Sequence, residues 1–143
     1  SYEHIATGIT WTAATTHLTS SPGSTQELAR KNRTIEARVL VALCRKYDVD
    51  VIAADLNNSK VDPETPRGII EAAGFTDWRS ATEVANVDYD THHEIAHHPP
   101  RKSTHIDAIY LGPRVTAVSG RVQITEPDSS DHFGLVCTIS VKK

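Results

Sequence analysis

Residues 50–57 read Asp-Val-Ile-Ala-Ala-Asp-Leu-Asn, and this stretch indicates the class of fold. A short apolar run that ends in a carboxylate is typical of a strand that is buried on both faces. The carboxyl end of such a strand delivers its polar group to a crevice at the edge of the sheet. We therefore predict a buried strand from Asp50 to Asp55, with Asp55 and Asn57 at a crevice.

Upstream of this strand the sequence predicts another strand and a long helix. Residues 9–18 are rich in β-branched and aromatic side chains and alternate as a strand does, with His17 near the carboxyl end. Ser24 or Thr25 can cap a helix that continues to about Tyr47. A strand, a helix and a buried strand in this order form a parallel crossover unit. Apolar positions of the amphipathic helix are Leu28, Ile35, Val39, Leu43 and Tyr47.

Downstream, residues 67–73 predict a short helix that Gly74 ends, and residues 76–104 are the least regular part of the chain. Two or three strands close the sequence: 106–111, 116–125 with a possible interruption at Gly120, and 135–141. The resulting order of strands and helices predicts an α/β layered arrangement.

The totals of the 143-residue chain indicate a single soluble globular domain, with 38% apolar and 23% charged residues. No apolar run is long enough to cross a bilayer, and nothing in the sequence assigns a cell compartment. Methionine is absent, so we expect that an upstream part was removed. Cys44 and Cys137 are expected to be free thiols in apolar surroundings. The net charge of −3 is unfavourable for holding DNA through a basic surface.

Four short segments place polar side chains at the ends of predicted strands. Because strand ends on one edge of an α/β sandwich converge, we expect the four to form a single cleft. The segments are Thr16-His17-Leu18, Asp55-Leu56-Asn57, His105-Ile106-Asp107 and Ser130-Asp131-His132.

Oxygen donors and histidines in these segments suit phosphodiester hydrolysis with a hard cation. Asp55, the Asn57 carbonyl and Asp131 are ligands of the type that Mg²⁺ or Mn²⁺ accepts. His132 could act as a general base on water if Asp107 fixes its tautomer. His17 would then face the opposite side of the phosphate and donate to a non-bridging oxygen.

In order and spacing, the four segments resemble the motifs "THL", "GDFN", "hIDyI" and "SDH" of the endonuclease/exonuclease/phosphatase superfamily. The resemblance implies a deoxyribonuclease-I-like fold and a Mg²⁺-dependent hydrolase. It also implies roles for Asp55 and Asn57 around the attacking water, for His132 as a base paired to Asp107, and for Asp131 near the metal. A small departure is that Ala54 and Leu56 replace the usual glycine and phenylalanine.

A larger departure is length, because members of this superfamily are typically nearly twice as long. Their amino-terminal half supplies an asparagine and a metal-binding glutamate, and neither has a counterpart before His17. The resemblance therefore implies that residues 1–143 are the carboxy-terminal half of a four-layer α/β sandwich, with a mixed sheet and helices on one side. Such a half would leave an apolar sheet face in water, so we expect a missing partner segment or self-association through that face.

The histidine-rich loop allows other interpretations. His93-Glu94-Ile95-Ala96-His97 matches the zinc-protease pattern, which needs a stable helix that Pro99 and Pro100 disfavour. The plainer alternative is a solvated loop over the cleft, formed with His92 and His98. Arg101 and Lys102 are placed to touch a substrate backbone.

Three functions remain open for this chain. The first is a Mg²⁺- or Mn²⁺-dependent phosphodiesterase, most simply a nuclease, that is incomplete as an isolated chain. The second is a non-catalytic half-domain used for assembly or binding. The third is a phosphatase or phosphodiesterase on a small substrate of the inositol-phosphate or phospholipid type, which the acidic balance favours.

Overall fold

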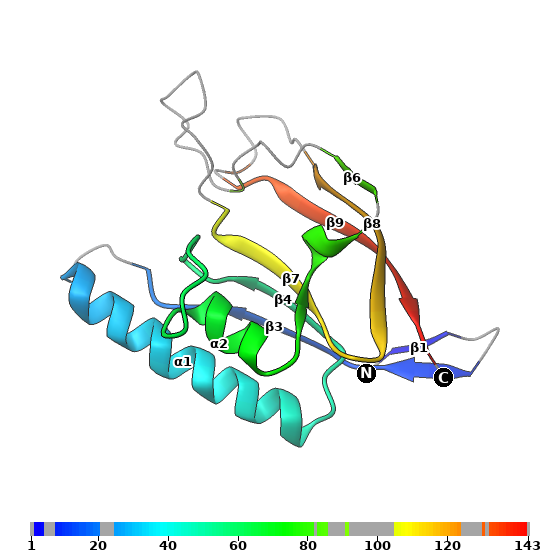
Figure 1. The fold of residues 1–143 in the computed structure, drawn as a ribbon, viewed down its shortest axis with the longest axis horizontal. Helices are drawn as coiled ribbons and strands as arrows, with labels where there is room; N and C mark the ends of the chain where they lie inside the picture. Colours follow the sequence, from blue (N-terminus) through cyan, green and yellow to red (C-terminus); the bar gives the residue numbers. More distant parts are fainter. Residues whose placement is uncertain are drawn as a thin grey trace.

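The computed structural model describes residues 2–4, 8–20, 25–81, 83–85, 91, 105–123, 130 and 132–142, with residues 2–4 described as backbone alone. Within these ranges, two α-helices and a 3₁₀ turn at Trp78–Ser80 accompany strands that form three sheets (Figure 1). Two short strands, β1 (Tyr2–His4) and β2 (Ile9–Trp11), pair as an antiparallel hairpin before the central sheet. No helix in the described ranges is both long enough and apolar enough to span a bilayer.

The central sheet has the strand order β3-β4-β7-β5. Its strands are β3 (Ala13–His17), β4 (Val51–Asp55), β7 (Asp107–Leu111) and β5 (Thr76–Asp77). β3 and β4 are parallel, whereas β7 is antiparallel to both β4 and β5. The predicted crossover unit is confirmed, because α1 (Gln26–Lys46) connects the parallel pair.

The strand predicted over residues 9–18 is wrong in one respect, because it is divided at Thr12 into β2 and β3. The Thr12 N–H donates to the Asp50 Oδ2 atom at 3.0 Å. Its carbonyl accepts from the backbone N–H groups of Asp50 and Val51. These contacts fix Thr12 at the point where the chain leaves the hairpin and enters the central sheet.

Both helices pack on one face of the central sheet. Thr25 caps α1 through the Leu28 N–H, and Thr65 caps α2 (Pro66–Ala72), which ends before Gly74 at φ +95°. Alternation along the strands explains this core, since every second residue of β4 and β7 points toward the helices. Its buried residues include Leu40, Cys44, Ile52, Ala54, Ile70, Ala108 and Tyr110.

The expected amphipathic helix forms, but the apolar positions predicted from its sequence are not its buried face. Ala29, Ala37, Leu40, Val41 and Cys44 of α1 are the buried positions. Leu28, Ile35, Val39, Leu43 and Tyr47 lie on another side and are about half exposed. The buried side combines the small Ala29 and Ala37, which allow a close approach to the sheet, with the larger Leu40 and Val41.

A second sheet, with the order β6-β8-β9, packs against the other face of the central sheet. β6 is Glu83–Ala85, β8 is Val115–Gln123 and β9 is Gly134–Val141. Val51 and Leu111 contribute to this packing from the central sheet, and Val115 and Ala117 contribute from β8. The sheet face that was expected to lie in water is therefore partly covered within this chain.

The irregularity in β8 lies at Val118, and not at Gly120 as the sequence suggested. The register with β9 shifts between Ala117 and Ser119, which is the signature of a bulge. Gly120 continues the strand, and a side chain there would collide with the ring of the buried Trp78. The glycine therefore permits close packing and does not interrupt the strand.

Candidate active site

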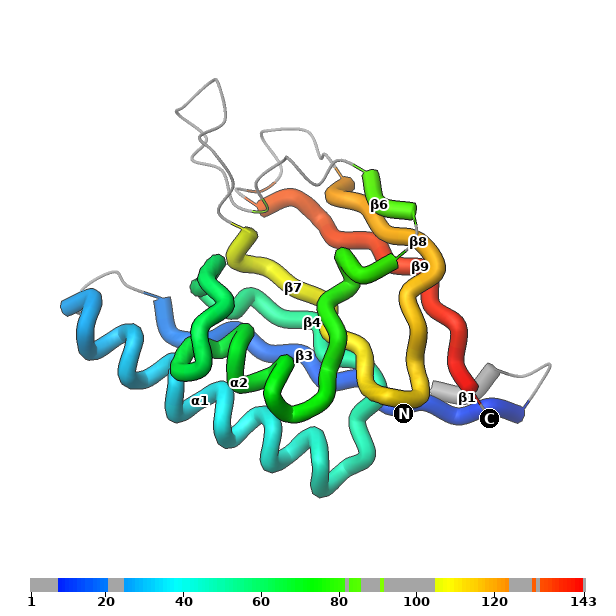
Figure 2. The backbone as a smooth tube through the Cα atoms, viewed as in Figure 1, coloured from blue at the N-terminus to red at the C-terminus, as the bar shows by residue number. Residues whose placement is uncertain are grey.

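Strand register places three of the expected site residues in one row. His17 of β3 is opposite Asp55 of β4, and Asp55 is opposite Asp107 of β7. Since β7 runs against β3 and β4, its beginning lies at the edge where they end, beside the beginning of β9 (Figure 2). Neighbouring residues in register point to the same side of a sheet, so the row forms without any contribution from loops.

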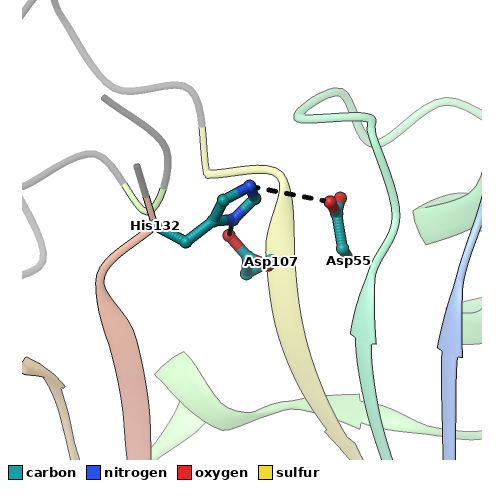
Figure 3. A group of neighbouring side chains, drawn as sticks. All are labelled: Asp55, Asp107 and His132. Carbon is teal, nitrogen blue, oxygen red and sulfur yellow. Dashed lines mark hydrogen bonds and ion pairs between the residues drawn. The ribbon is translucent and has the colours of Figure 1, made fainter. Parts of the chain in front are cut away.

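His132, just before β9, joins this row from the second sheet. Its Nδ1 atom lies 2.9 Å from Asp107 Oδ2, and its Nε2 atom lies 3.9 Å from Asp55 Oδ2 (Figure 3). On the other side of Asp55, the His17 Nε2 atom is 3.3 Å from the same Oδ2. The structure thus brings His17, Asp55, Asp107 and His132 into one cluster with Asp55 between the imidazoles.

Burial decreases across the cluster from the carboxylates to the histidines. The side chains of Asp55 and Asp107 are 15% and 19% exposed, whereas His132 is 32% and His17 is 67% exposed. Burial raises the pKa of Asp107 above its ordinary value, and the negative charge of Asp55 adds to this effect. Hydrogen bonds from His132 and Thr91 lower the pKa but do not cancel the rise.

Asn57 turns the chain immediately after Asp55. Its φ of +47° is a left-handed conformation that asparagine tolerates better than most residues. The Asn57 N–H donates to Asp55 Oδ1 at 2.8 Å, and its side-chain amide donates to the Leu18 carbonyl at 2.9 Å. Asn57 therefore fixes the Asp55 carboxylate and ties the end of β4 to the end of β3.

Sequence reasoning missed Arg67, a buried arginine behind the row that is 1% exposed. Its guanidinium donates to the backbone carbonyls of Asn58, His105 and Asp107, and it pairs with the Asp77 carboxylate at 3.0 Å. These contacts join the loop after β4 to the start of β7. An arginine in the first turn of a short helix, one turn before Ile69 and Ile70, was the available signal.

Thr91 is a second residue that the sequence did not mark. It is fully buried, and its hydroxyl oxygen accepts a hydrogen bond from the Asp107 N–H at 3.0 Å. Its carbonyl accepts from the Phe133 N–H at 2.9 Å. Thr91 thus bridges the strand that carries Asp107 and the residue that follows His132.

The cluster holds acidic and imidazole groups close enough together for some of them to contribute to a divalent-cation site. One ligand atom from each of Asp55, Asp107 and His132 lies within 4.8 Å of the others. Among the described residues, no lysine or arginine forms an ion pair with Asp55 or Asp107. Two neighbouring carboxylates without a fixed cation form a site whose negative charge a bound metal ion would balance.

Several expected functional residues lie outside the described residues. Asp131 is one of them, so its expected part in metal binding has no structural counterpart here. The others are the histidines and basic residues of the irregular segment: His92, His93, His97, His98, Arg101 and Lys102.

Comparisons with protein-family models and with curated proteins each found no match to this sequence. Solved structures, however, match its fold. An endonuclease/exonuclease/phosphatase from Bacteroides vulgatus has a TM-score of 0.75 and 20% identity, over 98% of this chain and 53% of that one. A mannosyl-6-phosphatase from Bacteroides thetaiotaomicron VPI-5482 has a TM-score of 0.63 and 14% identity, over 96% and 54% of the two chains. Humanized D. rerio TDP2 has a TM-score of 0.58 and 21% identity, over 90% and 55%.

These similarities confirm the expected resemblance at the level of fold. The chain is α/β, with mixed sheets and two helices, and it matches the deoxyribonuclease-I-like fold of endonuclease/exonuclease/phosphatase structures. It spans about half the length of the structures that it matches.

Proposed function

We propose that this chain supplies the carboxy-terminal part of a divalent-cation-dependent phosphoesterase domain. Its favoured reaction is hydrolysis of a phosphodiester bond in nucleic acid by a water molecule. One observation carries the proposal, namely that the Asp107–His132 couple faces Asp55 across the row. An acid-oriented imidazole beside a carboxylate that no described lysine or arginine neutralises is suited to activating water next to a bound cation.

In this proposal, His132 is the general base. Its Nδ1 proton is donated to Asp107, which fixes the tautomer and directs Nε2 toward the Asp55 side. Nε2 takes a proton from the attacking water as the new oxygen–phosphorus bond forms and the bond to the leaving oxygen breaks. Asp107 stabilises the imidazolium that results, as the acid of a catalytic triad does.

Asp55 and Asn57 would hold Mg²⁺ or Mn²⁺, with Asp131 as a further ligand. Mg²⁺ commonly keeps several waters and needs only one or two protein carboxylates, so a partial ligand set is sufficient. When bound, the ion would polarise the phosphoryl group and neutralise charge that develops on it. His17, on the exposed side of Asp55, is positioned to donate to a non-bridging phosphate oxygen.

A small phosphoester is the second candidate substrate. The net charge of −3 gives little support for a long nucleic-acid contact, and one structure of similar fold is a mannosyl-6-phosphatase. A small anion could be held by the metal and the two histidines alone. The third possibility is a non-catalytic half-domain, in which the cluster is retained without turnover.

The test measures hydrolysis by the full-length gene product. The substrates are a DNA oligonucleotide, an inositol phosphate and a sugar phosphate, each with Mg²⁺, Mn²⁺ or EDTA. We expect EDTA to abolish activity and His132→Ala to lower kcat by about 10²- to 10⁴-fold. Asp107→Asn should also lower kcat, whereas the matched control Asp50→Asn should retain it, because Asp50 lies at the other end of β4.

Each outcome has a definite meaning. Activity that survives His132→Ala, or that is insensitive to EDTA, would contradict the proposed mechanism. Cleavage of the sugar or inositol phosphate without cleavage of DNA would select the small-substrate alternative. A full-length protein that folds and hydrolyses none of the substrates with either metal would support the non-catalytic half-domain.

A further inference from the structure

The Asp107–His132 couple joins side chains from two different sheets. Asp107 begins β7 in the central sheet, and His132 lies just before β9 in the second sheet. The His132 Nδ1 atom and the Asp107 Oδ2 atom are 2.9 Å apart (Figure 3). A hydrogen bond across two sheets keeps its geometry only if the groups on both sides are held in place. The contacts that hold these groups therefore determine how well the couple is aligned.

Thr91 contacts both sides of the couple, although it belongs to neither strand. It is fully buried, and the Asp107 N–H donates to its Oγ1 atom at 3.0 Å. On the other side, the Phe133 N–H donates to the Thr91 carbonyl at 2.9 Å. One buried residue thus connects the backbone of the acid with the backbone next to the imidazole.

The Thr91 hydroxyl also forms a hydrogen bond with the Asp107 carboxylate. Burial raises the pKa of Asp107, and the hydrogen bonds with His132 and Thr91 oppose that rise. A hydroxyl has one proton to donate and two lone pairs to accept with. Because Oγ1 accepts from the Asp107 N–H, its own proton is available to the carboxylate. The same oxygen atom therefore holds Asp107 by its backbone and by its side chain.

This second bond matters because an aspartate carboxylate rotates easily. The last side-chain torsion of aspartate is broad, so one hydrogen bond leaves the plane of the carboxylate poorly fixed. Threonine is stiff about χ1, and a buried threonine gives its hydroxyl a fixed direction. A carboxylate that accepts from Thr91 on one side and from His132 Nδ1 on the other keeps the imidazole proton on Nδ1. Nε2 then stays free on the Asp55 side.

We propose that Thr91 is a positioning residue for the Asp107–His132 couple. Its hydroxyl sets the orientation of the Asp107 carboxylate and, through it, the tautomer of His132. The inference rests on the proposed function in taking His132 as the base that activates water. Because Thr91 acts through Asp107, loss of its hydroxyl should lower kcat and leave KM nearly unchanged.

The experiment compares Thr91→Val with Thr91→Ser in the full-length gene product. Valine has nearly the shape of threonine but no hydroxyl, whereas serine keeps the hydroxyl. With Mg²⁺ and each of the DNA, inositol-phosphate and sugar-phosphate substrates, Thr91→Val should lower kcat by about 10- to 100-fold while KM stays within about 3-fold. Thr91→Ser should keep kcat within about 3-fold of the unchanged protein, because the hydroxyl is retained.

The matched control is Thr34→Val. The Thr34 hydroxyl also bonds to the backbone of another segment, since it donates to the Glu64 carbonyl at 2.8 Å, but it lies on α1 and contacts neither member of the couple. This variant should keep kcat within about 3-fold. Thermal denaturation shows whether each variant is folded, and Thr91→Ala serves as a second variant without a hydroxyl.

A second measurement does not depend on turnover. In protein with ¹⁵N-labelled histidine, the NMR signals of Nδ1 and Nε2 report the tautomer at a pH at which the imidazole is neutral. His132→Gln identifies the His132 signals by their loss. We expect the Nδ1-protonated tautomer in the unchanged protein, in Thr91→Ser and in Thr34→Val, and a mixture in Thr91→Val. If the protein hydrolyses none of the substrates, the proposed function fails, and the tautomer still tests the role of Thr91.

The following results would overturn the inference. Unchanged kcat in Thr91→Val would show that the hydroxyl is not needed. Equal losses in Thr91→Val and Thr91→Ser would assign the effect to packing of the methyl group. An unchanged His132 tautomer in Thr91→Val would show that the hydroxyl does not act through the couple. If neither variant without a hydroxyl folds, the role of Thr91 is in the fold and not in positioning.

Discussion

The two ends of strand β4 carry carboxylates in opposite circumstances. At the beginning, Asp50 is 4% exposed and accepts from Arg114 Nε at 3.0 Å, from Arg114 Nη2 at 2.7 Å and from the Thr12 N–H. At the end, Asp55 faces two imidazoles and the Asp107 carboxylate, and no described arginine or lysine pairs with it. Asp50 is thus neutralised within the fold, whereas among the described residues Asp55 has only histidines as its possible cationic partners.

This difference shows that an acidic residue at a strand end becomes a candidate site through its partners. Arg67, a buried cation behind the row, donates to backbone carbonyls and to Asp77, and to neither site carboxylate. Arg67 therefore supports the backbone behind the row without pairing with either site carboxylate. Acidic groups without such a partner commonly lower stability at functional sites.

The largest effect on stability is expected at Arg67, which supports the site end of the sheet. Arg67→Ala leaves the backbone carbonyls of Asn58, His105 and Asp107 without their donor, so the free energy of unfolding should fall by about 3–5 kcal/mol. The matched control is Arg79→Ala, because Arg79 also pairs with Asp77 but is 35% exposed. Its loss should cost about 0–1 kcal/mol. Chemical denaturation measures both, and equal costs would refute the support role of Arg67.

A smaller effect should distinguish the two ends of β4 directly. Asp50→Asn should lower the free energy of unfolding by about 1–2 kcal/mol, because the charge-assisted bonds to a partly exposed arginine are weakened. Asp55→Asn should leave it unchanged or raise it, because repulsion with Asp107 is relieved and the amide oxygen still accepts from Asn57. Thermal denaturation of the two variants tests this difference. A clear loss of stability in Asp55→Asn would show that Asp55 is a structural acid like Asp50.

The smallest effect is the pH dependence of stability that Asp77 causes. Asp77, like Asp50, is paired with arginine within the fold. Burial alone would raise the pKa of Asp77, but the hydrogen bonds and charge of Arg79, together with the charge of Arg67, hold that pKa below its ordinary value. Because the folded pKa is depressed, the stabilisation is complete above the unfolded value and is lost as pH falls through the folded pKa. Denaturation between pH 5 and about 2 should therefore show a loss of stability that Asp77→Asn lacks. Parallel curves for the two proteins would contradict this assignment.

The sequence was sufficient for the elements that obey local rules. Thr25 caps the first helix and Gly74 follows the second, as expected, and the alternating residues of β9 share one face. It was insufficient where a distant partner decides the local structure. Asp50 divides the first predicted strand at Thr12, and Trp78 explains Gly120 without any interruption.

For the candidate site, the residue types were visible in the sequence, and their mutual geometry was not. The pattern of polar residues where predicted strands end or begin marked His17, Asp55, Asn57, Asp107 and His132, which the structure places close together. Arg67 and Thr91 carried no comparable pattern, because their importance comes from backbone groups that are distant in sequence.

The sequence by itself determined the order of strands and helices, the caps and the chemical types of the strand-end residues. These features depend on neighbours within a few positions of the chain. Their influence is visible in the sequence as apolar periodicity and as capping residues. Tertiary structure alone decided which carboxylate is neutralised by an arginine and which faces histidines. It also decided which side of α1 is buried, because burial depends on the surface that the helix meets and not on how apolar each side is.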